Sequence, residues 1–409
     1  MRYFTATLLL IFSVAAQATN GYFPHGWGIT AKGMGGVSIA SPQDSIAAAN
    51  NPAGMALIGH RVDFGFDSFS PHRTANLTGG AADQQLNGNG ISSFVIPELG
   101  YNRPMGASTV GVSIFGNGGM NTSYGSGINL LGTGSAGVNL SQLFIAPTYT
   151  YKFGNQAVGV SLNIAYQQFE AKGIQNFDGA SESPGSVSNQ GQDTSSGFGA
   201  SLGWIGTFNK LQLGANYRSI TSMSEFDSYK GLFAEQGGFD IPSMYGVGLL
   251  YHVNDKLGVG MDVTRINYSD VPAINNPQSN LFAGNPLGST NGPGFGWEDI
   301  TVVKLGLFYK QSDAFTFRFG VNQGENPIPE KETLFNLLAP GVTETHVTLG
   351  GTYTTANKVD ITFMYMVALA KEVNGKNSVP PGAPPGFGGG EANLKMNQSS
   401  FALAFGWHY

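Results

Sequence analysis

The last residues of the chain alternate strictly between large and small side chains. Phe401, Leu403, Phe405, Trp407 and Tyr409 are large and apolar, whereas the residues between them are small or polar. A period of two predicts a β-strand with two unlike faces. A soluble strand usually buries its bulky face in a core and then turns away, but this aromatic face continues to the final residue. The strand therefore needs an apolar environment on its outer side.

The composition is consistent with a chain whose apolar outer face lies in lipid. Charged residues make up 11% of the chain, and glycine accounts for 60 of its 409 residues, against usual values of about 25% and about 7%. Such a chain suits a membrane β-barrel with an apolar exterior and small residues in its wall. The aromatic end resembles the assembly signal of bacterial outer-membrane barrels. We therefore expect the strand ending at Tyr409 to bind the barrel-assembly machinery.

Several classes of protein are excluded or disfavoured. The chain has no cysteine, which excludes disulfide scaffolds and thiolate metal sites. Its net charge of −6 offers no basic patch for nucleic acid. The run 132–137 fits the dinucleotide pattern G-x-G-x-x-G but lacks a following helix, so we interpret it as a loop. Because no nucleophile motif or metal-ligand spacing appears, we expect no enzyme activity, no metal and no cofactor.

The first 59 residues divide into two segments, a predicted signal peptide and a predicted hatch. Residues 1–18 have a positive start, a short apolar run and a small-x-small cleavage site, which predicts a secretory signal peptide. Residues 19–59 are rich in glycine and small residues and do not alternate, which favours a compact hatch that plugs the lumen. A flexible periplasmic tail is the alternative. Within the hatch, the turn formed by Asn51, Pro52 and Ala53 is the candidate gate.

Residues 60–409 predict a 14-stranded antiparallel transmembrane β-barrel. Short Asn, Asp and Gly turns alternate with long loops, as in outer-membrane barrels with periplasmic turns and extracellular loops. We expect a monomer in the outer membrane of a Gram-negative bacterium, in contact with its lipids and lipopolysaccharide. The predicted strands are 61–70, 91–101, 109–115, 139–153, 157–171, 197–208, 211–224, 242–253, 257–268, 298–310, 315–322, 344–355, 359–370 and 393–409.

The same alternation assigns an unusual lumen, because many inward positions are apolar. Such residues suit a path for an apolar ligand, although they could equally pack against the hatch. The inward cations could meet a ligand carboxylate, or could pair with the inward Asp63, Glu98, Asp262 and Asp360. The candidate ligand-binding residues of the lumen are Phe94, Phe115, Phe144, Arg218, Lys304, Phe308, Arg318, Met364 and Met366.

The third strand contains an irregularity. Phe115 is followed by Gly116, Asn117, Gly118 and Gly119, and glycines inside a strand mark a bulge or a bend. A bend would open the wall between neighbouring strands. A simple strand end before a long loop is the alternative.

Three stretches resemble the long-chain fatty-acid outer-membrane transporter family of the FadL/TodX type. They are residues 28–58, including Asn-Pro-Ala; residues 297–330, with LGLFYKQSDAFTFRFGVNQGENPIPE; and the C-terminal strand. The resemblance implies passive uptake of hydrophobic molecules, such as long-chain fatty acids or aromatic hydrocarbons. It also implies lateral exit at a kinked third strand, with the hatch as the gate.

Two other functions remain open at this point. The long loops could bind partners as in a surface adhesin or receptor, although loops 269–297 and 371–392 are rich in Gly, Pro and Asn and lack the aromatic anchors typical of binding surfaces. A general diffusion porin is the third hypothesis. The apolar lumen and the hatch favour hydrophobic transport over both.

Overall fold

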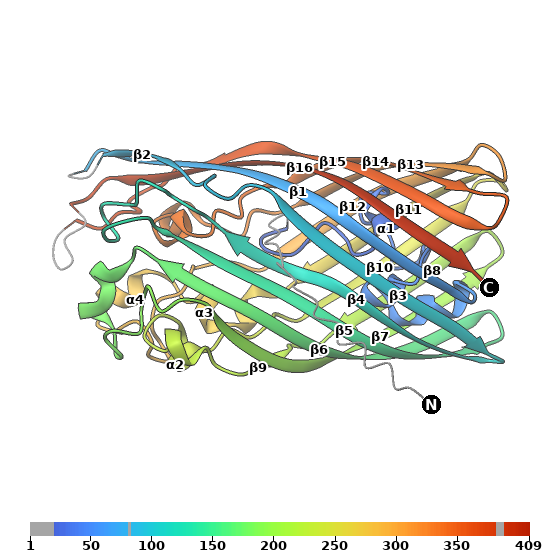
Figure 1. Cartoon of the computed structure of the whole chain (residues 1–409), viewed down its shortest axis with the longest axis horizontal. Helices are drawn as coiled ribbons and strands as arrows, with labels where there is room; N and C mark the ends of the chain where they lie inside the picture. Colours follow the sequence, from blue (N-terminus) through green and yellow to red (C-terminus); the bar gives the residue numbers. More distant parts are fainter. Residues whose placement is uncertain (1–19, 81–82, 382–387) are drawn as a thin grey trace, which may run out of the picture.

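The chain folds into a closed antiparallel β-barrel in this computed structural model, which describes residues 20–80, 83–381 and 388–409 (Figure 1). The sheet has sixteen strands, and pairing of the first with the last closes it. Two of them, β2 (Gln84–Asn87) and β9 (Ser222–Met223), are short additions beside the wall. Fourteen strands therefore form the wall, as predicted. The predicted signal peptide, 1–18, lies outside the described residues.

The wall strands follow one another around the barrel in chain order. Their bounds are Arg61–Thr78 (β1), Phe94–Met105 (β3), Ser108–Asn121 (β4), Gly137–Phe153 (β5), Gln156–Lys172 (β6), Asp193–Phe208 (β7), Leu211–Arg218 (β8), Met244–His252 (β10), Leu257–Ile266 (β11), Ile300–Lys310 (β12), Phe315–Gly324 (β13), Thr345–Thr354 (β14), Val359–Val373 (β15) and Glu391–His408 (β16).

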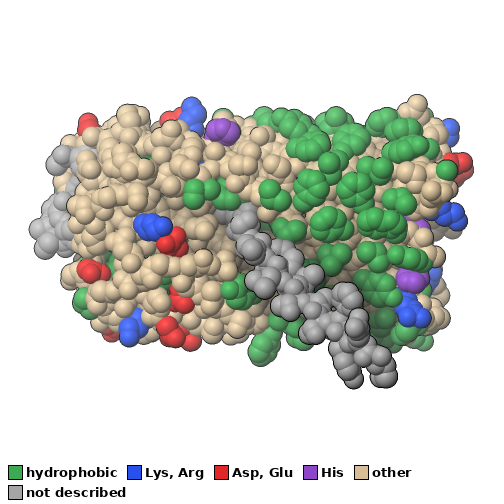
Figure 2. All heavy atoms as spheres, viewed as in Figure 1, with side chains coloured by type: hydrophobic (Ala, Val, Ile, Leu, Met, Phe, Trp, Pro, Cys, Tyr) green, Lys and Arg blue, Asp and Glu red, His purple; other side chains and the backbone are tan. Residues whose placement is uncertain are grey.

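The two faces of the wall differ as the alternation predicts. On β13 the rings of Phe315, Phe317 and Phe319 are exposed, whereas Arg318 between them is buried. Hydrophobic side chains cover the half of the barrel that carries the chain's C-terminus and the short turns, and charged side chains are scattered over the loop-bearing half (Figure 2). The first half therefore has the apolar exterior that a membrane requires.

All helices of the described residues are short. No helix in the described ranges is long and apolar enough to cross a membrane. Three lie in the N-terminal segment and the others lie in connections between strands. Their bounds are Ile29–Lys32 (α1), Ala47–Ala49 (η1), Pro52–Leu57 (η2), Gln175–Ala180 (η3), Asp227–Tyr229 (η4), Ala234–Gly237 (α2), Tyr268–Asp270 (η5), Pro272–Asn275 (α3), Ser279–Phe282 (α4), Glu330–Glu332 (η6) and Phe335–Leu337 (η7).

The N-terminal segment, residues 20–59, lies inside the barrel. Helix α1 contacts β14 and β15 on one side of the lumen, and η2 contacts β5, β6 and β7 on another. Inward glycines make this close approach possible, because a Cβ at Gly203 of β7 would lie 2.0 Å from Asn51 Oδ1. The side chain of Asn51 accepts a hydrogen bond from Ala53 N at 3.0 Å and thereby caps η2.

Several predicted strand bounds need correction. The first strand continues past residue 70 to Thr78, because β16 pairs with it along its whole length. The third continues past Phe115 to Asn121. The predicted seventh strand divides in two, because β8 ends at Arg218 and β9 pairs separately with an earlier part of β7. Strand ends cannot be read from alternation alone where strands extend beyond the apolar band.

Candidate functional site

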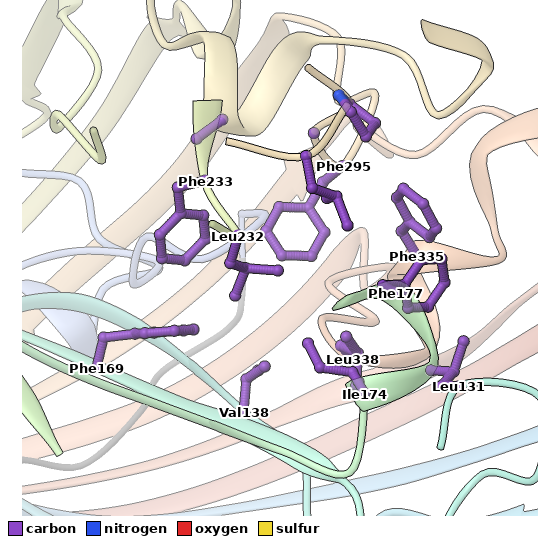
Figure 3. Close-up of a pocket in the computed structure, with 14 residues that line it drawn as sticks. Leu131, Val138, Phe169, Ile174, Phe177, Leu232, Phe233, Phe295, Phe335 and Leu338 are labelled. Carbon is purple, nitrogen blue, oxygen red and sulfur yellow. The ribbon is translucent and has the colours of Figure 1, made fainter. Parts of the chain in front are cut away.

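An apolar pocket lies among the long loops. It encloses about 540 Å³ of unoccupied space, counting its mouth. Figure 3 shows the rings of Phe169, Phe233, Phe295, Phe177 and Phe335 turned toward it. No charged side chain lines it. Its lining residues are Leu131, Val138, Phe169, Ile174, Phe177, Leu232, Phe233, Ala273, Leu287, Pro293, Gly294, Phe295, Phe335 and Leu338.

The sequence reasoning missed this pocket. Loop 269–297 is predicted to lack aromatic anchors, and this prediction is wrong, because its Phe295 lines the pocket and its Trp297 is fully buried. Trp297 Nε1 donates to Asn336 Oδ1 at 2.6 Å, which joins this loop to the one that holds η7. The one sequence signal that could have indicated the pocket is the presence of phenylalanines in long loops that show no strand-like alternation. Their convergence depends on loop packing, which no local pattern encodes.

Nearby polar groups hold these loops together. Glu332 of η6 accepts a hydrogen bond from Gln278 N at 2.8 Å. Gln278 Nε2 donates to Ser378 O at 2.9 Å, so three loops meet at this point. Burial raises the pKa of the Glu332 carboxyl above its usual value. The pocket is thus built by loops that depend on one another.

A series of aromatic rings leads from the pocket into the lumen. Phe169 and Phe233 have ring centroids 4.6 Å apart, and Phe233 lies 4.8 Å from Phe239. Phe239 is followed by Tyr22 of the N-terminal segment at 6.4 Å. The remaining steps run from Tyr22 to Phe23 (4.8 Å), Phe23 to Trp27 (6.2 Å), Trp27 to Phe115 (6.1 Å) and Phe115 to Phe144 (5.6 Å).

The series ends at an interruption of the barrel wall. The β4–β5 register shifts between Gly116 and Gly118, so Asn117 forms a β-bulge. The third predicted strand, which is β4, therefore continues past Phe115 through a bulge and does not simply end there. Pairing between β3 and β4 stops at Glu98 and Phe115, although both strands continue.

Phe94–Pro97 of β3 still pairs with β1, and Gly116–Asn121 of β4 still pairs with β5, but the two stretches do not pair with each other. We call this break between them the wall gap. The chain rejoins beyond it, where Ser123 N donates to Gly88 O and Gly90 N donates to Ser123 O, both at 3.0 Å. The N-terminal segment backs the gap from inside, because Gly119 N donates to Tyr22 O at 3.1 Å. A Cβ at Gly118 would lie 2.5 Å from the same oxygen.

A buried cation stands beside the bulge. Arg218 donates to Asn117 Oδ1 and to Ala49 O of the N-terminal segment, both at 2.7 Å. Its guanidinium lies 4.5 Å from the Trp27 ring centroid and 5.2 Å from that of Phe144, within range of cation–π attraction. The structure thus brings together four of the predicted residues, Phe115, Asn117, Phe144 and Arg218.

The predicted gate lies elsewhere. Asn51 Nδ2 donates to Trp204 O of β7 at 3.0 Å, and Thr150 of β5 donates to Pro52 O at 2.8 Å. Ala53 packs with Ala157 and Ile205. The turn therefore contacts β5 to β7 rather than the wall gap.

The other predicted lumen residues all point inward but are dispersed. Phe94, Met364 and Met366 pack in one cluster with Ile29 of α1, and Phe308 packs with Met34. For these four, packing against the N-terminal segment accounts for the apolar side chains.

The two remaining predicted cations also meet the N-terminal segment. Lys304 Nζ donates to Gly36 O at 3.4 Å, and Arg318 Nε donates to Gln43 Oε1 at 2.8 Å. In the described part of the chain, neither forms an ion pair, and neither does Arg218. The lumen ion pairs are formed by other cations: Lys32 with Asp67 at 2.7 Å, and Arg61 with Asp63 and with Asp360.

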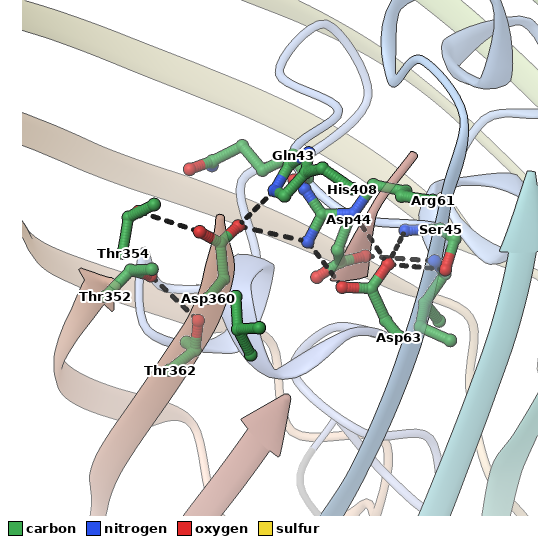
Figure 4. Close-up of polar contacts among 12 residues, drawn as sticks. Gln43, Asp44, Ser45, Arg61, Asp63, Thr352, Thr354, Asp360, Thr362 and His408 are labelled. Atoms are coloured by element: carbon green, nitrogen blue, oxygen red, sulfur yellow. Dashed lines mark hydrogen bonds and ion pairs between the residues drawn. The ribbon is translucent and has the colours of Figure 1, made fainter. Parts of the chain in front are cut away.

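A polar cluster secures the N-terminal segment near the short turns (Figure 4). Asp63 of β1 accepts a hydrogen bond from Ser45 N at 2.8 Å and pairs with Arg61. Asp360 of β15 lies 3.3 Å from Arg61 and 2.8 Å from His408 of β16. The cluster spans the seam where the first and last strands meet.

Together, the apolar outer band, the occupied lumen and the apolar route define a transport barrel of the outer membrane. Residues 11–409 match the model of the outer membrane protein transport protein family (OMPP1/FadL/TodX). The chain belongs to this family, whose members transport hydrophobic compounds. No curated protein sequence matched it.

Solved structures share the fold across nearly the whole chain. The toluene transporter TodX of Pseudomonas putida superposes with a TM-score of 0.69 at 17% identity, covering 94% of this chain and 99% of that one. A FadL homologue of Pseudomonas aeruginosa gives 0.69 at 16%, with coverage of 96% and 99%. The toluene transporter TbuX of Ralstonia pickettii gives 0.63 at 19%, with coverage of 94% and 99%.

Proposed function

We propose that this protein takes up hydrophobic small molecules, namely long-chain fatty acids or related apolar compounds, by passive diffusion across the outer membrane. The ligand enters the loop pocket, follows the aromatic series into the lumen and leaves sideways through the wall gap. The observation that carries this proposal is that β3 and β4 lose their pairing where the aromatic series ends. A lateral exit spares an apolar ligand from crossing water.

The N-terminal segment acts as the gate in this proposal. Tyr22 holds Gly119 through a hydrogen bond, and Arg218 links Asn117 of the bulge to Ala49. A ligand at Phe115 would have to displace these contacts before it reached the gap. In this proposal the N-terminal segment is the predicted hatch, residues 19–59, and its movement would open the route.

A second candidate is an aromatic-hydrocarbon channel of the same family. The loop pocket favours it, because the lining carries five phenylalanines and no charged group that could receive a carboxylate. A neutral aromatic ring would lose no hydrogen bonds on entering such a pocket. The two candidates differ in ligand and share the route.

Two further expectations belong to the same proposal. The protein acts as a monomer among outer-membrane lipids and lipopolysaccharide, and the strand ending at Tyr409 binds the barrel-assembly machinery. The exposed aromatic residues Phe401 and Trp407 on the outer face of β16 support that last expectation.

A cross-link across the wall gap tests the route. A Cβ at Gly116 would lie 2.8 Å from Ile96 Cγ2, so Ile96→Cys with Gly116→Cys places two thiols face to face in a chain that lacks cysteine. Proteoliposomes would be assayed with oleate, toluene and a sugar of similar size. We expect oxidation to stop delivery of the hydrophobic ligand and reduction to restore it.

Each single-cysteine variant is the control, and oxidation should leave its transport unchanged. Undiminished transport by the cross-linked barrel would contradict lateral exit. Passage of the sugar alone would contradict hydrophobic transport itself.

A further inference from the structure

A polar cavity, separate from the loop pocket, lies at the end of the barrel that carries the short turns. Its volume is about 230 Å³, and because about 10–15 Å³ of such space is enough for one water molecule, a small solute fits. The N-terminal segment lines one side of it, and β8, β10, β12 and β13 line the other. Short turns face the periplasm in outer-membrane barrels, so we expect this cavity to be reached from periplasmic water.

Three basic side chains line the cavity, and no acidic side chain among the described residues does. They are His252 at the end of β10, Lys310 at the end of β12 and Arg318 of β13. His252 and Lys310 both lie beside Phe308, with the His252 ring centroid and Lys310 Nζ each 5.9 Å from the centroid of its ring. None of the three basic residues takes part in the ion pairs of the described chain. The cavity therefore has an excess of positive charge.

Arg318 is the buried member of this group, with 7% of its surface exposed. Its Nε donates to Gln43 Oε1 and its Nη1 donates to Thr352 Oγ1, both at 2.8 Å. These acceptors are neutral, and no carboxylate of the described residues lies within ion-pair distance of the guanidinium. A buried guanidinium with neutral partners gains strongly from an anion that reaches it, because charge-assisted hydrogen bonds are about twice as strong as neutral ones.

The remaining polar groups of the lining favour an oxyanion with several acceptor oxygens. Ser41 and Thr316 contribute hydroxyl groups, and Gln43 and Gln212 contribute side-chain amides. Hydroxyl, amide, ammonium and guanidinium groups all donate hydrogen bonds, and a phosphate offers enough oxygens to accept from several of them at once. The strands of the wall separate the cavity from lipid, so such a ligand would come from water and not from the bilayer.

We propose that this cavity binds a small, doubly charged oxyanion of the periplasm, such as phosphate or a phosphate monoester, and that the bound anion holds the N-terminal segment in place. The anion contacts Ser41 and Gln43 of the segment on one side, and Lys310 and Arg318 of the wall on the other. Displacement of the segment divides the site, so the anion binds the seated state and stabilises it by mass action. It is a regulator distinct from the hydrophobic cargo, and the inference does not depend on lateral exit.

The test uses inorganic phosphate on the purified full-length barrel, in a detergent with a neutral head group and at constant ionic strength. Phosphorus NMR follows binding, and amide hydrogen exchange follows residues 38–51 of the N-terminal segment. At phosphate concentrations ten times the measured Kd, we expect exchange in this stretch to slow about tenfold, since only the seated state binds. Acetate at the same concentration carries a single charge and should leave exchange unchanged.

Lys310→Met removes one cation from the mouth of the cavity. We expect it to weaken phosphate binding at least about tenfold, because it removes a hydrogen bond to a charged group. Lys310→Arg keeps a cationic donor at this position and should restore binding. Lys256→Met is the matched control, because Lys256 is an exposed lysine at the same end of the barrel and does not line the cavity. It should bind phosphate as the wild type does.

Four results would overturn the proposal. The first is a wild type that does not bind phosphate, and the second is an equal loss of binding in Lys310→Met and Lys256→Met, which would indicate general surface charge. The third is unchanged exchange in residues 38–51 at saturating phosphate, and the fourth is an equal response to acetate. No hydrophobic ligand is present in these measurements, so their outcome is independent of the transport assays.

Discussion

Glycine at position 203 is the point at which the seating of the N-terminal segment can be tested most directly. A Cβ there would lie 2.0 Å from Asn51 Oδ1 and 2.9 Å from Pro52 Cδ. Ordinary contacts are 3.4–4 Å long, so the contact with Asn51 is too short by more than an ångström, and Gly203→Ala pushes the Asn51 side chain and η2 away from the wall. That movement breaks the hydrogen bonds from Asn51 to Trp204 O and from Thr150 to Pro52 O.

The magnitude follows from these contacts. Two neutral hydrogen bonds contribute about 1 kcal/mol each, and overpacking a tight contact costs about 1–3 kcal/mol. The ratio of displaced to seated segment should therefore rise by about two to four orders of magnitude. The strands of β5 to β7 keep their own pairing, so the barrel remains folded.

Ion conductance across a planar lipid bilayer measures this displacement. We expect Gly203→Ala to show frequent opening events where the wild type shows few. Gly179→Ala is the control, because a Cβ at Gly179 meets no atom within 4 Å. Equal conductance of the two variants, with both folded, would refute the view that the turn at Asn51, Pro52 and Ala53 seats the gate.

Three further outcomes are expected. Deleting residues 19–59 should leave a folded barrel with altered uptake, as judged by heat modifiability on gels and by liposome transport; an unfolded barrel would contradict a separable hatch. Phe233→Ala should weaken ligand uptake about tenfold at low concentration, since a buried phenylalanine contributes about 1.5–3 kcal/mol of apolar contact; an unchanged KM would exclude the loop pocket as an entry site. Burial raises the pKa of the Glu332 carboxyl in the folded protein. The folded loops therefore lose stability as the pH rises from the carboxyl's unfolded-state pKa through its higher folded-state pKa. Glu332→Gln should therefore raise the melting temperature at pH 8 and leave it unchanged near pH 4, and a shift of equal size at both would refute this.

The barrel could be predicted because its signal is local. In the C-terminal strand, Phe401, Leu403 and Phe405 recur with period two, which indicates a strand, and strands can face lipid only in a closed barrel. The inward orientation of side chains such as those of Phe94 and Arg318 follows from the same alternation. The strand ends did not follow, because β1 and β16 extend beyond the apolar band and pair there through polar residues such as Asn76 and Asn393.

The candidate site was predicted only where it lies on strands. Asn117, Phe115 and Arg218 were identified from their strand positions, but no pattern indicated that they meet at one bulge. The pocket residues Phe233 and Phe295 come from separate loops and are joined by tertiary packing alone.

The position of α1 has a consequence for the order in which the molecule is assembled. Ile29 packs against Ala402 and Ala404 of β16 and Met364 of β15, and α1 also contacts β1. The first helix thus lies behind the seam where β1 and β16 close the barrel, so we expect the barrel to close and the helix to be seated together. A substitution at Ile29 would show itself as a defect in biogenesis before any change in transport could be measured. Changes at η2, against β5 to β7, are free of that complication.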